Sequence, residues 1–402
     1  MTDLTPSDAL ARVQPSATLA VTQKARELRA AGRDVMALAA GEPDFPTPAH
    51  VAEAGIQAIR DGHTTYTPVD GIPALKEAIA AKFSRDNGLD YDPGTEVVAT
   101  PGGKYLVFAA MLATLNPGDE VVIPAPYWVS YPDMVRLAGG TPVIAETRMA
   151  DEYVLTPEAL EAAITSATRW VILNSPSNPT GGVYGPEATA ALAEVLRRHP
   201  GVWVLTDDMY EHVLYDAEFA TIASVAPDLK DRTLTMNGAS KAYAMTGWRM
   251  GYGGGPAQLM GMIRKVMSQS TSNPCSISQH ATVAALNGDH GFLAERNAAF
   301  RARRDRVHAA LNGAKGLSCF LPQGAFYLYP SCGGAIGKRA GGRVIETDVD
   351  FCEALLDAEA VAVVPGTAFG SSPAFRVSYA TDMATLEEAC ARVTRFCEGL
   401  EG

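Results

Sequence analysis

The sequence predicts an α/β protein with a large domain, built on a mostly parallel mixed sheet flanked by helices, and a smaller α+β domain. Its 402 residues exceed the usual size of one hydrophobic core. Between residues 95 and 255, short β-branched apolar runs alternate with helical patterns, as in sheets covered on both faces. Hydrophobic residues make up 47% and charged residues 19%, a composition typical of a folded globular protein.

The elements of the large domain follow from these patterns. One helix is expected from Pro186 to Arg198, because proline suits a first helical position and Leu192, Val195 and Leu196 form an apolar stripe. Gly201 lies just past its end. The strands are expected at the apolar runs 97–98, 121–123, 143–144, 170–173, 202–205 and 233–236.

The two ends of the chain are predicted to form the small domain. We assign residues 47–289 to the large domain, and residues 1–46 together with 290–402 to the small one. After residue 290 a long polar helix precedes apolar runs at 325–329 and 361–364. The glycine-rich stretch 333–342 predicts a mobile loop.

Composition excludes several classes of partner. The net charge is −12, the wrong sign for a nucleic-acid-binding protein, and the arginines between 301 and 306 are interpreted as a solvated helix face. No apolar run of eighteen residues and no signal peptide is seen, so no membrane partner is expected. The cysteines lack CxxC pairs and the histidines lack metal-ligand spacing, which favours a reducing, cytoplasmic location and no metal.

Four clusters follow predicted strands, at the strand ends where open α/β sheets bind ligands. The first, Thr100 to Lys104, opens a helix, and its glycines Gly102 and Gly103 leave backbone N–H groups free to bind a phosphate. The second, residues 174–181, is a proline-rich loop that can fix the Asn178 amide. Taken alone, the first cluster is better explained by a tight strand-to-helix turn, whereas the second is as compatible with a simple connecting turn as with a binding loop.

The third and fourth clusters carry ionisable side chains. Asp207 ends an apolar strand and Tyr210 follows three residues later, whereas Asp208 and Glu211 are interpreted as structural or solvated. Lys241 lies among small and apolar residues, where burial lowers the pKa of an amine toward the neutral, nucleophilic form. Together the four clusters predict a ligand site centred on a reactive lysine.

The fourteen residues from Gly238 to Gly251 resemble the lysine motif of class I aminotransferases, which are pyridoxal-phosphate enzymes of fold type I. The resemblance runs over nearly the whole chain and is closest to the bacterial Ib branch of aspartate aminotransferases. It implies a homodimer with shared active sites and ping-pong transamination of L-aspartate and 2-oxoglutarate to oxaloacetate and L-glutamate. Its other motifs are residues 40–45, Tyr66, 126–128, 174–181, Asp207 and 375–379.

The resemblance also implies a role for each matching residue around the cofactor. Lys241 would hold pyridoxal phosphate as a Schiff base and transfer the substrate proton, and Asp207 would pair with the pyridine nitrogen. Asn178 and Tyr210 would bond to the phenolic oxygen, and Trp128 would stack on the ring. The phosphate would be surrounded by Gly102, Gly103, Lys104, Arg249 and, from the neighbouring subunit, Tyr66.

The substrate carboxylates are assigned in the same way. Arg376 would bind the α-carboxylate through its planar guanidinium, with the Gly41 N–H beside it and Trp128 and Asn178 against the substrate. The distal carboxylate would meet Lys104, Ser16 and Thr18. One departure is Gly238, where many family members carry a serine that binds the phosphate.

Alternative functions remain open at this point. Aromatic or prephenate amino transfer fits the same branch, and Arg12 or Gln14 could tune that choice. A β-eliminating C–S lyase shares the lysine and aspartate, whereas a cofactor-binding regulator would need a DNA-binding extension and a basic charge. The glycines from 251 to 255 fail the nicotinamide fingerprint and are interpreted as close packing on a strand.

Overall fold

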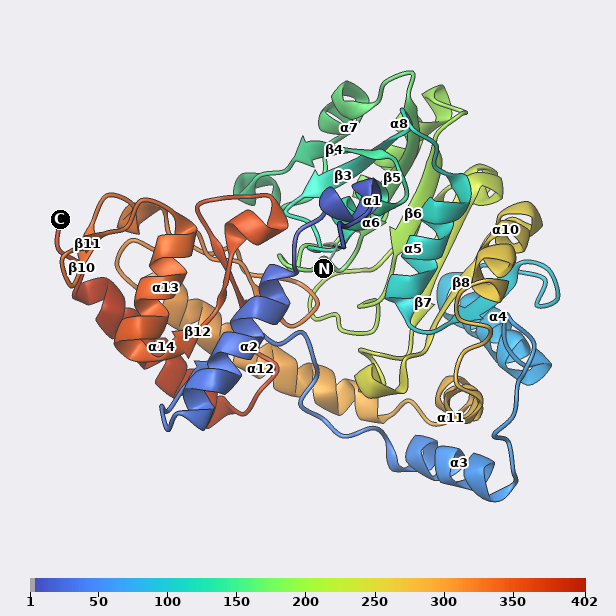
Figure 1. Cartoon of the computed structure of the whole chain (residues 1–402), viewed down its shortest axis with the longest axis horizontal. Coiled ribbons are helices and arrows are strands. Elements are labelled where there is room, and N and C mark those ends of the chain that lie inside the picture. The colour runs from blue at the N-terminus through green and yellow to red at the C-terminus, as the bar shows by residue number, and fades with distance from the viewer. Residues whose placement is uncertain (1–3) are drawn as a thin grey trace.

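A seven-stranded sheet forms the centre of the protein, for which the computed structural model describes residues 4–402 (Figure 1). The strand order is β2-β8-β7-β6-β5-β3-β4; β8 runs antiparallel to both neighbours and the other pairs are parallel. The predicted mostly parallel mixed sheet is therefore confirmed. The strands are β2 (Val97–Thr100), β3 (Glu120–Ala125), β4 (Thr141–Glu146), β5 (Thr168–Asn174), β6 (Trp203–Asp207), β7 (Thr233–Gly238) and β8 (Gly251–Gly254).

Both faces of this sheet are covered, because successive side chains of a strand point to opposite faces. Val121 and Ile123 join one core cluster with α5, α6 and α10, whereas Val122 between them joins another with α7, α8 and α9. Helices α3, α4 and α11 cover the β2 and β8 end. The helices are α3 (Ala49–Arg60), α4 (Pro73–Asn87), α5 (Gly103–Thr114), α6 (Tyr131–Leu137), α7 (Pro157–Ala163), α8 (Pro186–Arg198), α9 (Ile222–Val225), α10 (Ala257–Ser268) and α11 (Ser276–Asn287).

Helix α8 has the predicted bounds, with Pro186 in its first turn. Leu192, Val195 and Leu196 are buried against the sheet, as their spacing along one helix face requires. The glycines of β8 also lie where they were expected, on a sheet strand. A Cβ on Gly251 would lie 2.1 Å from the Gly103 nitrogen, so this strand packs backbone to backbone against the start of α5.

The N-terminal arm and the C-terminal part meet at one end of the molecule, where Figure 1 shows α2 (blue) with the orange and red elements. Strand β1 pairs in parallel with β12, and β13-β14-β9 form a second sheet. This pairing supports our proposal that residues 1–46 and 290–402 make one domain. The elements are α2 (Ala17–Ala30), β1 (Met36–Ala37), α12 (Phe292–Gly313), β9 (Tyr327–Leu328), α13 (Asp348–Glu359), β12 (Val361–Ala362), β13 (Val364–Pro365), β14 (Phe375–Ser378) and α14 (Met383–Glu398). The short helix α1 (Asp8–Ala11), at the start of the arm, instead contacts α6 beside the large sheet.

Two expectations from sequence need correction. The glycine-rich stretch 333–342, expected as a loop, contributes a 3₁₀ turn at Gly333–Ala335 and a hairpin of β10 (Arg339–Ala340) and β11 (Arg343–Val344). Gly341 and Gly342 have positive φ of 54° and 85°, which the tight hairpin turn requires. The arginine run is not wholly solvated, because Arg304 is buried and donates to Asp216 and to the Pro322 carbonyl.

None of the helices within residues 4–402 is both long and apolar enough to cross a membrane.

Candidate active site

A cavity of about 490 Å³ lies at the carboxyl ends of β5, β6 and β7. It collects predicted residues from distant parts of the chain, which confirms that the sequence clusters meet in space. Gly102 lies behind its wall, where a Cβ would contact the Arg249 guanidinium at 2.4 Å. The predicted residues that line the cavity are Ser16, Thr18, Gly41, Gly103, Lys104, Trp128, Asn178, Asp207, Tyr210, Lys241, Arg249 and Arg376.

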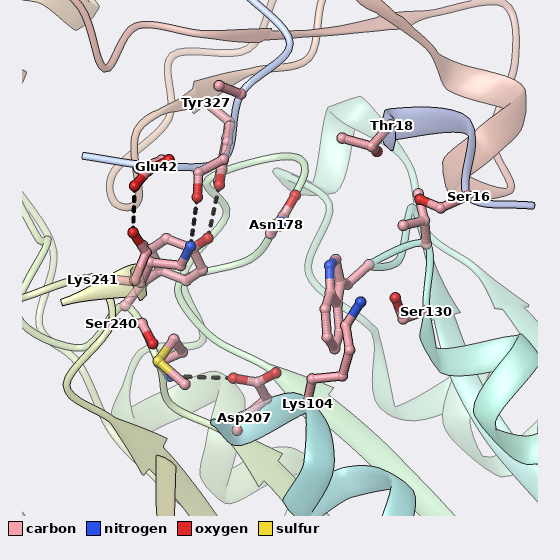
Figure 2. Close-up of a pocket in the computed structure, with 18 of the residues that line it drawn as sticks. Ser16, Thr18, Glu42, Lys104, Ser130, Asn178, Asp207, Ser240, Lys241 and Tyr327 are labelled. Atoms are coloured by element: carbon pink, nitrogen blue, oxygen red, sulfur yellow. Dashed lines mark hydrogen bonds between the residues drawn. The ribbon is translucent and has the colours of Figure 1, made fainter. Parts of the chain in front are cut away.

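Lys241 follows β7 and lies mostly buried in the cavity wall. Its Nζ donates to the Gly41 carbonyl at 2.5 Å (Figure 2). Burial, together with the positive charge of Arg376, lowers the pKa of Lys241 to about 8. A useful fraction of this amine is therefore neutral near pH 7–8, which a nucleophilic lysine needs.

Asp207 ends β6 and is buried. Burial raises its pKa to about 6, although a hydrogen bond from Tyr131 opposes the rise. The Tyr131 hydroxyl donates to Asp207 Oδ2 at 2.5 Å, and the Met209 N–H donates to Oδ1 at 3.3 Å. Tyr131 was missed from sequence; the only signal was its place three residues after Trp128, at the start of α6.

Asn178 and Arg376 meet across the cavity from opposite parts of the chain. Arg376 Nη1 donates to Asn178 Oδ1 at 2.8 Å, and Nη2 donates to the Ala39 carbonyl at 2.7 Å. Arg376 Nε is buried and has no hydrogen-bond partner among the described residues. The two hydrogen bonds use two of the five guanidinium N–H groups and both acceptors are neutral, so the remaining donors and the positive charge suit Arg376 to an incoming anion.

Two tyrosines close the side of the cavity near Lys241. The buried hydroxyls of Tyr210 and Tyr327 lie 2.8 Å apart. A Cβ on Gly41 would lie 2.8 Å from the Tyr327 hydroxyl, so glycine allows the crossing chain to approach this ring. Tyr327 was not predicted, because it lies 117 residues from Tyr210 on the second sheet.

The turn from β2 into α5 can bind an anion. Gly102 has φ of +90° and precedes Gly103, the first residue of α5, whose first-turn N–H groups have no partner within the helix. Arg249 lies beside this turn in a left-handed conformation, with Nη1 donating to the Thr246 carbonyl at 2.8 Å. A helix N-terminus and a guanidinium together favour a doubly charged phosphate.

The far end of the cavity carries hydroxyls and cations. Figure 2 shows Lys104, Ser130 and Ser16 on one side of the cavity and Lys241 with Tyr327 on the other. Lys104 Nζ lies 4.9 Å from the centre of the Trp128 ring, and partial burial with the Arg249 charge lowers the pKa of Lys104. The Thr18 hydroxyl oxygen is buried without a partner in the described chain.

Some residues of this far end were not predicted. Ser130, Thr22 and Arg26 also line the cavity, the last two from α2. Tyr66, in contrast, is 88% exposed and does not line the cavity of its own chain.

The residues present fit pyridoxal phosphate. The buried Asp207 carboxylate can face a protonated ring nitrogen, and Lys241 can bond to the aldehyde carbon. The phosphate fits the start of α5, where a Cβ on Gly102 would meet Arg249 and a Cβ on Gly103 would meet Met236, so the glycines let Arg249 approach the free N–H groups of this turn closely. Trp128 offers an aromatic face beside these groups.

Comparison with known proteins agrees with this fit. Residues 33–393 match the family model for aminotransferases of class I and II. An aspartate/prephenate aminotransferase of Cereibacter sphaeroides is 59% identical over 98% of this chain and 99% of the relative. An aspartate aminotransferase of Rhizobium meliloti is 52% identical over 98% of this chain and 97% of the relative.

Solved structures show the same similarity. The aspartate aminotransferase from Rhizobium meliloti superposes with a TM-score of 0.96 at 51% identity, covering 99% of this chain and 100% of the other. The Thermus thermophilus aspartate aminotransferase with maleate gives a TM-score of 0.91 at 43% identity, covering 98% and 100%. The chain therefore belongs to the class I and II aminotransferase family and is a pyridoxal-phosphate-dependent aminotransferase of fold type I.

Proposed function

We propose that the enzyme transfers the amino group of L-aspartate to 2-oxoglutarate, giving oxaloacetate and L-glutamate by a ping-pong mechanism. The observation that carries this proposal is the presence of anion-binding groups at both ends of one cavity. Arg376 contacts Asn178 and the Tyr327 ring. Figure 2 shows Lys104, Ser16 and Thr18 on the side of the cavity away from Tyr327. A dicarboxylic substrate satisfies both ends, whereas an amino acid with an apolar side chain leaves the second end unpaired.

In this proposal, Arg376 binds the α-carboxylate, and its pairing with Asn178 fixes the direction of the guanidinium. The Gly41 N–H lies beside the same carboxylate. Lys104, Ser16 and Thr18 bind the distal carboxylate, so that the Cα–H bond is held toward Lys241. The Cα proton moves to Lys241 Nζ, whose lowered pKa keeps part of the amine neutral and able to accept it.

The remaining residues hold the cofactor. Bound pyridoxal phosphate supplies an electron-withdrawing ring that acidifies the substrate Cα–H. Asp207 keeps the ring nitrogen protonated, Asn178 and Tyr210 bond to the phenolic oxygen, and Trp128 covers the ring face. Gly102, Gly103, Lys104 and Arg249 surround the phosphate.

We also propose a homodimer with shared active sites, located in the cytoplasm. Tyr66, exposed in one chain, would reach the phosphate of the partner's site. Mixing Lys241→Ala with Tyr66→Ala tests this, because a hybrid dimer regains one intact site. In an equimolar mixture about half of the dimers are hybrids, each with one intact site of two. Recovery toward about a quarter of the wild-type activity therefore supports shared sites, and no recovery refutes them. All six cysteines are free, as a reducing compartment favours.

The amino transfer is tested in single turnovers. Holoenzyme given aspartate without an acceptor should release one oxaloacetate per site and change the visible spectrum of its cofactor. Lys241→Ala should abolish this release. Release of pyruvate and ammonia from a cysteine conjugate would instead support a C–S lyase. Wild-type turnover by Lys241→Ala would refute the proposal.

Prephenate or an aromatic amino acid is a second candidate substrate, which a neighbouring cavity favours. That cavity, of about 440 Å³, shares Ser16, Lys104 and Arg249 with the first and adds the apolar side chains of Phe108 and Met134. It offers room for a ring beside the distal anion site. Comparing kcat/KM for 2-oxoglutarate and prephenate as acceptors, with aspartate as donor, separates the two substrates.

A further inference from the structure

Asp348, the first residue of α13, is a fully buried carboxylate outside the cavity. No lysine, arginine or histidine forms an ion pair with it among residues 4–402. Its Oδ1 accepts from the Thr367 hydroxyl at 2.6 Å, and its Oδ2 accepts from the Thr367 N–H at 2.9 Å and the Ala374 N–H at 3.4 Å. Because burying a carboxylate is costly unless donors satisfy it, these three hydrogen bonds hold Asp348 to this one loop.

These donors lie at both ends of the loop 366–374, which joins β13 to β14. The loop begins with a 3₁₀ turn, Gly366–Phe369, and ends just before the strand that carries Arg376. Tyr329 holds its centre by donating to the Ser371 carbonyl at 2.7 Å. Asp348 therefore ties the two ends of the loop together.

The inner side of this loop contacts the substrate-carboxylate arginine. The Phe369 ring is fully buried, and the guanidinium carbon of Arg376 lies 5.0 Å from its centre. The same guanidinium carbon lies 4.6 Å from the centre of the Tyr327 ring. Two aromatic rings thus restrict the plane in which Arg376 can present its donors.

The same loop also contacts the turn that carries the indole. The Tyr127 N–H donates to the Phe369 carbonyl at 3.0 Å, and Tyr127 directly precedes Trp128 of the cavity. Gly370 has φ of +74°, and a Cβ there would lie 2.3 Å from the Tyr127 ring. The close contact therefore requires glycine, and a displaced loop would disturb both Arg376 and the indole turn.

We propose that Asp348 is a positioning residue for the substrate carboxylate: by clamping the loop 366–374 it fixes Phe369 against Arg376 and so fixes the direction of the guanidinium. This inference rests on the proposed role of Arg376.

The test is Asp348→Asn in the holoenzyme. Asparagine keeps the shape but replaces one acceptor oxygen with an NH₂ group, which cannot accept from the loop. Losing a hydrogen bond of this kind corresponds to roughly a tenfold effect. We expect the KM for aspartate and the Kd for maleate, a non-reacting dicarboxylate, to rise roughly tenfold. Because the donors of Asp348 lie on this loop and not beside Lys241, kcat should change less than threefold. The affinity for pyridoxal phosphate, which the Trp128 turn also serves, should fall less than the affinity for maleate.

Asp350→Asn is the matched control. Asp350 lies one half-turn along the same helix and accepts from Thr347 and Arg343, so its loss weakens the start of α13 without touching the loop. If Asp350→Asn raises the KM for aspartate as much as Asp348→Asn does, the effect reflects a general weakening of α13 and the proposal is overturned. Thr367→Val, which removes only the hydroxyl partner, provides a second variant if Asp348→Asn does not fold.

A double-mutant cycle tests the path through Phe369. If Asp348 acts through that ring, Asp348→Asn should weaken maleate binding much less in a Phe369→Leu background than in wild type. If the two substitutions weaken maleate binding by additive free energies, Asp348 does not act through Phe369. The variant Arg376→Lys distinguishes the two proposals. If it binds maleate as tightly as wild type, the proposed role of Arg376 is refuted. If Arg376→Lys loses maleate affinity but Asp348→Asn does not, only the positioning role of Asp348 is refuted.

Discussion

Replacing Tyr131 with phenylalanine removes one hydroxyl from the buried neighbourhood of Asp207. In the structure this hydroxyl donates to Asp207 Oδ2 at 2.5 Å. The phenyl ring keeps the edge-on contact with Trp128, whose ring centre lies 5.2 Å away. The other groups whose charge or hydrogen bonding acts on this carboxylate, Lys241 and the Met209 N–H, are unchanged. The substitution therefore isolates one hydrogen bond.

The expected size follows from that bond. A hydrogen bond to a charged group stabilises it by about 1.5–3 kcal/mol, which is roughly a tenfold to 150-fold change in the equilibrium between carboxylate and acid. The wild-type pKa of about 6 leaves Asp207 mostly ionised at pH 7. Without the Tyr131 hydroxyl the same group should be mostly neutral at pH 7 and ionise only at higher pH.

The assay is titration of the apoenzyme with pyridoxal phosphate between pH 6 and 9, followed by absorbance. The Kd of Tyr131→Phe should exceed the wild-type value about twofold to fifteenfold at pH 7, because a neutral acid pairs poorly with a protonated ring nitrogen, and the difference in Kd should narrow toward pH 9. Tyr184→Phe is the control, since it removes a buried hydroxyl that accepts from the Leu155 N–H instead. An equal loss at every pH, or no loss, would refute the reasoning.

Three further predictions follow. Arg376→Lys should raise the KM for aspartate by roughly a hundredfold in steady-state assays, because a point charge replaces a planar fork, and a change under threefold would contradict it. Burial raises the pKa of Asp207 from 3.8 to about 6 in the folded apoenzyme, so the stability it contributes is largest below pH 4 and is lost as the pH rises through 6; relative to Asp207→Asn, the apoenzyme should lose about 2 kcal/mol between pH 4 and pH 6 in urea unfolding, and parallel curves would contradict this. Lys82→Met should lower the free energy of unfolding by about 3–5 kcal/mol because it leaves the buried Glu211 without its cation, and a loss below 1 kcal/mol would show that the pair is dispensable.

The sheet and the places where its strands end could be predicted from local pattern. Strands such as β5 read as continuous apolar runs because Trp170 and Ile172 enter one core while Val171 and Leu173 enter the other. In a parallel sheet the ends of neighbouring strands meet at one edge, so Asn174 and Asp207 had to lie close together. The site was predictable to the extent that it is built from strand ends.

Side chains brought in by distant segments could not be predicted in this way. Tyr327 reaches Tyr210 only because the second sheet packs against the segment that follows β6. No local sequence pattern predicts that contact. Arg304 belongs to a run that looks solvated, yet Asp216, 88 residues away, makes its burial possible. Contacts between residues so far apart in sequence depend on how the whole chain folds, not on the local pattern around either residue.

Gly238 shows how a local departure from a family pattern acquires a physical reason once the packing is known. A Cβ there would lie 2.9 Å from the Met250 carbonyl oxygen and 3.2 Å from the Gly251 Cα, so the end of β7 leaves no room for a side chain beside β8. Gly251 in turn contacts the backbone of Gly103 at the anion-binding turn. Because Gly238 offers no hydroxyl, in the proposed placement of the cofactor the phosphate charge would be balanced by the first turn of α5 and by Arg249.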